Sequence, residues 1–225
     1  MDISWEHVET TLPSLPLPPI SQRQPITTER LVIRPMREDD LEGYFELRRQ
    51  PEAMLGTALG KPDSDIDESR QAMKVFLPEN EEKSFLFGVF LKSTGELIGE
   101  GGVHNMKPSY CSWPEIGYKF KKEFWGQAYG TEFLKAFIIA WWKIPRSTAG
   151  SHRVCSPSVQ RAGNVAAEQL FALVVEDNIG SRKLLEKLGF VEFLSSTEPD
   201  TQVHRLGQPV TLIGYRLSAP ESSGK

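Results

Sequence analysis

The chain has 225 residues, of which 39% are hydrophobic and 25% charged, and its formal net charge is −4 at pH 7. This length suits one sizeable domain with an ample core, and the mildly negative charge excludes the basic surface that binds nucleic acid. No apolar run reaches the ~20 residues needed to span a bilayer, and the amino terminus lacks the basic start and apolar core of a signal peptide. We therefore expect a cytoplasmic protein, with a nuclear location left open, that engages neither membrane nor nucleic acid.

The first part of the chain, residues 1–25, is rich in proline. Its prolines are Pro13, Pro16, Pro18, Pro19 and Pro25. Proline fixes φ and lacks an N–H group, which excludes a helix or a central strand here and favours an extended conformation. We expect an N-terminal arm outside the core that lies on the domain or is flexible. A P-x-x-P recognition segment at residues 13–16 is the less favoured alternative.

Alternating and helical patterns follow the arm. Residues 27–34 alternate as a strand, and helices are predicted at about 37–49 and 69–76. Residues 84–91 and 96–103 form a predicted hairpin. Glycine is frequent in the second strand of that hairpin, at Gly99, Gly101 and Gly102, which indicates a bulge or a close backbone approach.

The chain contains two cysteines, Cys111 and Cys155. They form no Cys-x-x-Cys motif and lack the spacing of metal ligands. The sequence therefore predicts free thiols in a reducing compartment and no metal site.

The most informative stretch is residues 113–142. Residues 115–120 alternate as a strand, a glycine turn follows at 126–130, and an almost wholly apolar helix starts near Thr131. A glycine turn that opens a buried helix points free backbone N–H groups and the positive end of the helix dipole at one spot, which suits a phosphate. The P-loop lysine is missing and no G-x-G-x-x-G occurs in this stretch, so neither a P-loop nor a dinucleotide fold is indicated.

The next segment, residues 143–163, is polar and contains prolines and glycines, which predicts a long loop insertion. A continuous apolar run that ends at Val175 then indicates an internal strand.

A capped helix follows that strand. Asn178 can cap it and Gly189 ends it. The last two strands are expected at 190–194 and 209–216, and a disordered tail is expected at 219–225.

Two motifs resemble those of one family. The segment W-G-Q-A-Y-G at residues 125–130 resembles the coenzyme-binding motif A of the GNAT acetyltransferases, and N-x-x-S-x-x-L-L-x-x-L-G-F at residues 178–190 is similar to their motif B. The opening T-E-R-L-x-x-R-P and the run E-I-G-Y look like the branch of ribosomal-protein alanine N-acetyltransferases. Ala128 and Gly130 depart from the pattern, because glycine is usual at the first position and alanine is common at the second.

The resemblance implies a fold. It predicts an α/β (α+β) GNAT domain over residues 26–218, with a central, mixed, mostly antiparallel twisted sheet of about six to seven strands flanked by about four helices. It also implies a splay between the fourth and fifth strands, which are the strand at 115–120 and the strand that ends at Val175. Unpaired backbone groups in that splay would grip the pantetheine arm of acetyl-coenzyme A, and one N–H group could face the thioester oxygen.

The resemblance also implies the residues that bind this co-substrate. They are Tyr118, Phe120, Trp125, Gly126, Gln127, Ala128, Tyr129, Gly130, Thr131, Asn178 and Ser181. Within this set, Asn178 maps to the position that bonds pantetheine or the acetyl group, and Ser181 maps to the position proposed to protonate the leaving thiolate. Four nearby cations either meet the coenzyme phosphates or form a solvated charged face: Lys121, Lys122, Arg182 and Lys183.

The general base is open at this stage. An α-amine has a reference pKa near ~8 and is partly neutral in the cell, so it needs less help than a lysine. Glu115, His104 and Glu176 lie near predicted strand ends, and a water relay is a further alternative. The candidate catalytic residues are Ser181, Glu115 and His104.

The implied function is that of an acetyl-CoA-dependent N-acetyltransferase. It would move the acetyl group to a primary amine, either a peptide α-amine or a small-molecule amine, by direct attack in a ternary complex. The alternative is a catalytically silent coenzyme A-binding module with a regulatory or assembly role. The expected partner is the amine acceptor, and a homodimer is left open.

Overall fold

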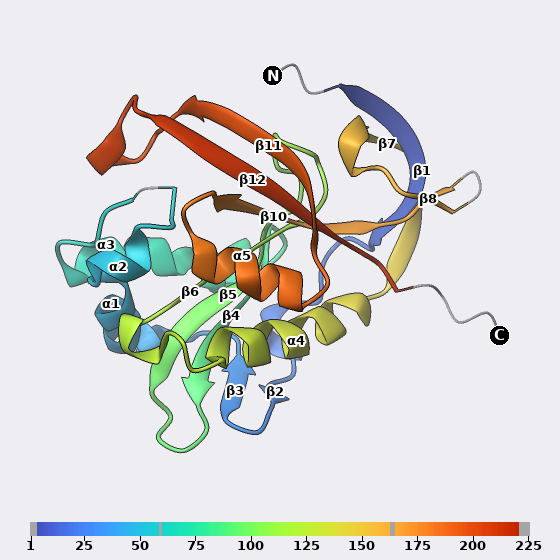
Figure 1. Ribbon diagram of the computed structural model, residues 1–225. Coiled ribbons are helices and arrows are strands. Elements are labelled where there is room, and N and C mark those ends of the chain that lie inside the picture. The colour runs from blue at the N-terminus through green and yellow to red at the C-terminus, as the bar shows by residue number, and fades with distance from the viewer. Residues whose placement is uncertain (1–3, 59, 163–164, 221–225) are drawn as a thin grey trace.

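The computed structural model describes residues 4–58, 60–162 and 165–220. Its centre is an eight-stranded sheet with the order β11-β12-β10-β6-β5-β4-β3-β2 (Figure 1). The strands of this sheet are β2 (Ile26–Thr27), β3 (Leu31–Arg34), β4 (Phe85–Leu91), β5 (Leu97–Asn105), β6 (Glu115–Phe120), β10 (Gln169–Val175), β11 (Val191–Pro199) and β12 (Pro209–Ser218). Every neighbouring pair in it is antiparallel except β6 and β10, which are parallel. The predicted mixed, mostly antiparallel sheet is confirmed, and the two-residue strand β2 extends its edge.

Helices cover the sheet on both faces. The α-helices in the described residues are α1 (Leu41–Arg48), α2 (Pro51–Met54), α3 (Ile66–Met73), α4 (Tyr129–Trp142) and α5 (Ile179–Lys187). Short 3-10 turns occupy Ile20–Gln22, Glu38–Asp40, Lys74–Phe76, Pro78–Asn80, Lys122–Phe124, Ser156–Ser158 and Val203–Arg205. None of the helices described is long and apolar enough to cross a membrane.

The main core lies between the sheet and α4. Phe133, Phe137 and Trp141 repeat at helical spacing on α4 and are fully buried. The Phe137 and Trp141 rings stack with centroids 6.5 Å apart, and Phe137 lies 6.0 Å from Phe85 of β4. A second apolar cluster joins α1 and α3 to the opposite face, around Tyr44. Each face of the sheet therefore has its own helical cover.

The hairpin of β4 and β5 confirms the prediction from its glycines. Gly102 has φ +137°, and a Cβ on it would lie 2.2 Å from the carbonyl oxygen of Phe85. Only glycine allows the two strands to approach this closely.

The prediction of a loop insertion at residues 143–163 is wrong. Residues 146–155, inside the expected loop insertion at 143–163, form strand β7 (Arg146–Cys155), which pairs antiparallel with β1 (Trp5–Pro13) from the N-terminal arm. This ribbon is separate from the central sheet, and the adjoining β8 (Arg161–Ala162) and β9 (Val165–Ala166) form a second small sheet. Residue 163 of the expected insertion and residues 221–225 of the expected tail lie outside the described residues.

The N-terminal arm is part of the core rather than outside it. Val8 on β1 is 3% exposed, and Leu17 is 1% exposed and packs into the main cluster with Phe85. Alternation in β1 buries Val8 and Thr10 on one side, while Glu9 and Thr11 between and beyond them are exposed. The proline content correctly excluded a helix and a central strand, but it hid this alternation. The boundary predicted at residue 25 therefore does not separate the arm from the packed domain.

The buried arm leads to a stability prediction. Leu17→Ala should lower the free energy of unfolding by about 2–5 kcal/mol, because it removes buried methyl groups and leaves a cavity. The matched control is Leu15→Ala, since Leu15 is 65% exposed and its loss should cost less than about 0.5 kcal/mol. Urea unfolding of both variants measures the difference. Equal midpoints for the two variants would show that the arm does not pack as described.

Candidate active site

The site begins where β6 and β10 separate. These strands pair at one position only, Phe171 with Glu115, and the Phe171 N–H donates to the Pro114 carbonyl at 2.8 Å. Each strand has a full ladder on its other side, β6 with β5 and β10 with β12. Beyond Glu115 the two facing edges therefore carry backbone groups without strand partners, which is the splay expected from the sequence.

A cradle of backbone amides follows β6. Within the described residues, no protein acceptor lies in hydrogen-bond reach of the N–H groups of residues 126–131. Gly126 has φ +72°, and Ala128, the N-cap of α4, has φ 65°. These left-handed positions turn the chain so that successive N–H groups precede the N-terminus of α4. Such a nest attracts an anion, and the helix dipole adds to the attraction.

Side chains hold this cradle in place. The indole N–H of Trp125 donates to the Phe120 carbonyl at 2.8 Å, although half of the side chain is exposed. Arg30 donates to the Gln127 carbonyl at 3.1 Å, lies 4.1 Å from the centre of the Tyr129 ring, and pairs with Glu132 at 2.7 Å. Sequence reasoning missed Arg30 and Glu132, because their partners are about a hundred residues apart.

Gly130 explains why the loop pattern departs from the usual order of glycine and alanine. A Cβ on Gly130 would lie 2.8 Å from a methyl carbon of Leu184 on α5. The missing side chain thus lets α4 and α5 approach each other at the open end of the splay. Ala128 instead accepts a left-handed conformation that costs roughly 1 kcal/mol for a residue with a Cβ.

The N-terminus of α5 faces the same opening. Asn178 caps this helix as predicted, and its Oδ1 accepts from the Ser181 N–H at 3.1 Å. The Tyr118 hydroxyl is buried and has no hydrogen-bond partner among the described residues. Burial raises the pKa of Tyr118 to about 12, and the nearby Ser181 side chain partly opposes this rise. The two hydroxyl groups are therefore close, but their geometry falls short of a hydrogen bond.

Two of the predicted catalytic residues, Glu115 of β6 and His104 of β5, lie on the opposite face of the sheet. Glu115 Oε2 lies 3.8 Å from His104 Nε2, and the two side chains are 14% and 45% exposed. Gly117 leaves room for the histidine, because a Cβ there would lie 2.9 Å from His104 Nδ1. Burial raises the pKa of Glu115 to about 7 and lowers the pKa of His104. The pair is thus a carboxyl group poised to exchange a proton near neutral pH beside a mostly neutral imidazole.

Other candidates are not brought into this arrangement. Glu176 is exposed in the turn after β10. Three of the four expected cations already have protein partners: Lys121 lies 2.8 Å from Glu96, Lys122 pairs with Glu52, and Arg182 bonds Tyr215 at 3.1 Å. Lys183 is exposed.

A buried ion pair lies farther along the same face. Lys119 of β6 pairs with Glu100 of β5, and the second oxygen of Glu100 has no partner among the described residues. Burial and the nearby Arg48 lower the pKa of Lys119 to about 7. The sequence offered one signal for this pair, which is a charge inside each of two otherwise apolar or glycine-rich strands.

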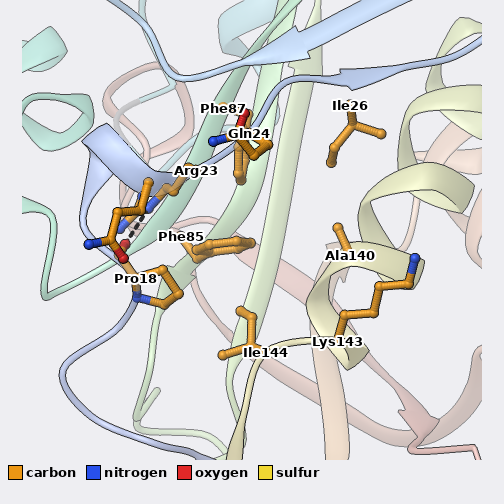
Figure 2. Close-up of a pocket in the computed structure, with 10 residues that line it drawn as sticks. Pro18, Arg23, Gln24, Ile26, Phe85, Phe87, Ala140, Lys143 and Ile144 are labelled. Carbon is orange, nitrogen blue, oxygen red and sulfur yellow. Dashed lines mark hydrogen bonds between the residues drawn. The ribbon is translucent and has the colours of Figure 1, made fainter.

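An apolar hollow elsewhere lacks this chemistry. A cavity of about 190 Å³ lies between the N-terminal arm, β4 and the end of α4, and Figure 2 shows the side chains that line it. Arg23 beside it is buried, lies 4.9 Å from the Phe85 ring centre, and donates to the Pro18 and Ser84 carbonyls. None of the described residues that line this hollow carries a carboxylate or a thiol, so the splay is the better candidate site.

Known proteins are similar to this chain in sequence and in fold. Residues 30–191 match the family model described as an acetyltransferase (GNAT) domain. The chain is 27% identical over 112 residues to the uncharacterized N-acetyltransferase p20 of Bacillus licheniformis, an alignment that covers 49% of this chain and 62% of that protein. The chain therefore spans less than two thirds of the length of this relative.

Two solved structures show a similar fold. The acetyltransferase (GNAT family) from Bacillus anthracis superposes with a TM-score of 0.64 at 17% identity, over 87% of this chain and 99% of that one. RimL, a ribosomal L7/L12 alpha-N-protein acetyltransferase in complex with coenzyme A, gives a TM-score of 0.64 at 14% identity, over 87% and 98%.

The raised pKa of Glu115 predicts a pH-dependent stability. The pKa of the Glu115 carboxyl group is about 7 in the folded protein and near ~4.3 in the unfolded chain. Its contribution to stability is therefore fully present below pH ~4.3 and is lost as the pH rises through 7. Between pH 4 and pH 8 the free energy of unfolding of wild type should fall by about 3 kcal/mol relative to that of Glu115→Gln. Denaturant unfolding across this range, with the exposed Glu176→Gln as control, measures the effect. Parallel stability curves for wild type and Glu115→Gln would contradict the described burial.

Proposed function

Because the chain belongs to the GNAT acetyltransferase family, whose domain model matches residues 30–191, we propose that it transfers the acetyl group of acetyl-coenzyme A to a primary amine. Membership confirms the resemblance expected from residues 125–130 and 178–190. The acceptor class and the roles of individual residues are the proposal.

One observation carries it: at the open end of the splay, residues 126–131 present N–H groups that have no acceptor in the described part of the protein. A pyrophosphate would satisfy these donors, and the unpaired edges of β6 and β10 would bind an amide-containing arm in an extended conformation. The residues present fit acetyl-coenzyme A, because a phosphate cradle, a narrow gap with free backbone groups and a buried hydroxyl follow one another along β6. Tyr118, Trp125 and Asn178 flank this path.

The chemistry needs two proton transfers. The new C–N bond forms as the thioester C–S bond breaks, one proton leaves the amine, and one reaches the sulfur. Glu115 is the base in this proposal, because a carboxylate with a pKa of about 7 matches an amine whose reference pKa is near ~8. His104 positions it. Tyr118 and Ser181, whose hydroxyl groups lie close together on the other face of β6, are the proton donors for the thiolate.

The acceptor proposed is a peptide α-amine or a small primary amine. A peptide α-amine is partly neutral at cell pH, whereas a lysine with a reference pKa of ~10.4 is not. RimL, which has a similar fold, is described as an alpha-N-protein acetyltransferase, which favours the peptide α-amine. Release of free coenzyme A thiol with a panel of amines tests the proposal. Binding without turnover on any of them would instead support a silent coenzyme-binding module.

The amide cradle predicts a test of coenzyme binding. Gly126→Asp should abolish binding of acetyl-coenzyme A, because it places a carboxylate against the expected pyrophosphate. Gly126→Asn is the matched control, since asparagine has nearly the same shape, tolerates the positive φ and is neutral. At 100 times the Kd the ligand should stabilise wild type against unfolding by about 2.7 kcal/mol. It should stabilise Gly126→Asn by nearly the same amount. Thermal unfolding with and without coenzyme measures this, and an undiminished shift in Gly126→Asp would place the phosphates elsewhere.

The proposed base predicts a pH profile. The kcat/KM of wild type should rise with pH through about 7, because the carboxylate must be ionised to accept the amine proton. Glu115→Gln should lose this limb and about 10²- to 10⁴-fold in rate, while any limb due to the acceptor amine remains. Glu176→Gln serves as control and should keep the wild-type profile. A Glu115→Gln variant with the wild-type kcat and profile would transfer the role to His104 or a water relay.

A further inference from the structure

Arg30 lies in the turn between β2 and β3, and its side chain reaches the N-terminal turn of α4. The Arg30 Nε donates to Glu132 Oε2 at 2.7 Å, and its backbone N–H donates to Glu132 Oε1 at 2.9 Å. The Nη1 of the same guanidinium donates to the Gln127 carbonyl oxygen at 3.1 Å. The guanidinium carbon lies 4.1 Å from the centre of the Tyr129 ring. One side chain therefore joins the first turn of α4 to the amide cradle that precedes it.

The backbone around Arg30 is itself held by neighbouring elements. The Arg30 carbonyl oxygen accepts from the Lys92 N–H at 2.8 Å, in the turn between β4 and β5. Thr28 Oγ1 accepts from the Leu31 N–H at 3.0 Å and donates to Glu132 Oε1 at 2.6 Å. The guanidinium therefore extends from a fixed point of the sheet edge, and its contacts with α4 are set by the fold.

The contact with Gln127 bears on the direction of one N–H group in the cradle. The Gln127 carbonyl and the Ala128 N–H belong to the same peptide group, which is planar and trans, so these two bonds point in opposite directions. Ala128 has φ 65°, a left-handed conformation that persists only where surrounding contacts hold it. Because Arg30 binds the carbonyl side of this peptide group, it fixes the direction of the Ala128 N–H on the other side. A charge-assisted bond to the carbonyl also polarises that N–H group.

Glu132 places a negative charge beside the same cradle. Its N–H donates to the Ala128 carbonyl at 3.0 Å, so it lies in the first turn of α4, where a carboxylate competes with a bound anion for the positive end of the helix dipole. Burial favours the neutral form of Glu132, but hydrogen bonds from Thr28 and Arg30 outweigh this effect and lower its pKa. The carboxylate is therefore ionised at neutral pH, and the Arg30 guanidinium, 2.7 Å away, offsets its charge.

We propose that Arg30 is a positioning residue for the acetyl donor, which aims the Ala128 N–H at the coenzyme phosphates and neutralises Glu132 beside them. This inference rests on the function proposed above, in which residues 126–131 bind the pyrophosphate. Arg30 acts through the cradle and through Glu132, and it takes no part in the transfer of the acetyl group. Its loss should therefore weaken binding of the coenzyme and leave the chemical step unchanged once the coenzyme is bound.

Equilibrium binding of coenzyme A to the full chain, measured by calorimetry, tests this role. Arg30→Met should raise the Kd by roughly 10- to 100-fold, the effect of losing a hydrogen bond to a charged group, while kcat at saturating acetyl-coenzyme A stays within about 2-fold. Arg30→Lys keeps the charge but lacks the fork that spans Glu132 and Gln127, so its Kd should rise by about 3- to 10-fold, and it serves if Arg30→Met does not fold. Lys92→Met removes an exposed charge next to Arg30 and is the matched control, which should keep the wild-type Kd.

A double variant and a local signal separate a positioning role from a merely structural one. Adding Glu132→Gln to Arg30→Met removes the negative charge left without its partner, and it should recover roughly 3- to 10-fold of the lost affinity. In amide spectra of isotope-labelled protein, saturating coenzyme A should shift the Ala128 N–H proton downfield in wild type and not in Arg30→Met.

The outcomes distinguish this inference from the function on which it rests. A wild-type Kd in Arg30→Met, a wild-type Ala128 shift in that variant, or no recovery in the double variant would overturn the role of Arg30 while the proposed function stands. A wild-type protein that binds no coenzyme A would overturn the proposed function and this inference together.

Discussion

The single pairing of Phe171 with Glu115 sets the geometry on which the rest of the site depends. β6 and β10 each satisfy one edge completely, with β5 and β12 respectively. They meet at one residue and then follow the twist of their own partners. Contact between Gly130 of α4 and Leu184 of α5 brings the two helices together at the open end. The gap is therefore bounded by the edges of two paired strands and by the ends of two helices, which suits a site that must hold an extended ligand.

Ionisable groups near the gap are buried at a cost in stability. Glu115 and Lys119 both titrate near 7 because burial disfavours their charged forms, and one oxygen of Glu100 has no partner among the described residues. Desolvation of this kind is not offset by Coulomb attraction unless the pairing is complete. The buried groups on this face of β6 thus lower the stability of the fold, and they can exchange protons near neutral pH. This is the pattern expected of a reactive site.

Part of the fold and of the candidate site could be predicted from the sequence, because the signals for it lie within a few neighbouring residues. Asn178 caps a helix and Gly126 takes a positive φ for reasons contained in a few neighbouring residues. The alternation of β6 was equally local, but it does not tell what covers the face of the strand that carries Lys119. That side chain is buried because α1 and α3 cover its face of the sheet, which no short window shows. Gln202 and Leu55, joined across 147 residues, left no local pattern at all.

The N-terminal arm shows how a distant segment supports the site. Strand β1 pairs with β7, and β7 contacts the loop that leads into β6. His152 Nε2 of β7 lies 2.9 Å from the Ser112 carbonyl oxygen, and the Cys155 N–H donates to the Cys111 carbonyl oxygen at 3.4 Å. The buried indole of Trp113 donates to Ser158 at 2.8 Å just after β7. Glu115 follows this anchored loop by two residues. The position of the proposed base is therefore set by a chain of contacts that begins at β1, so the proline-rich arm is one of the supports of the site.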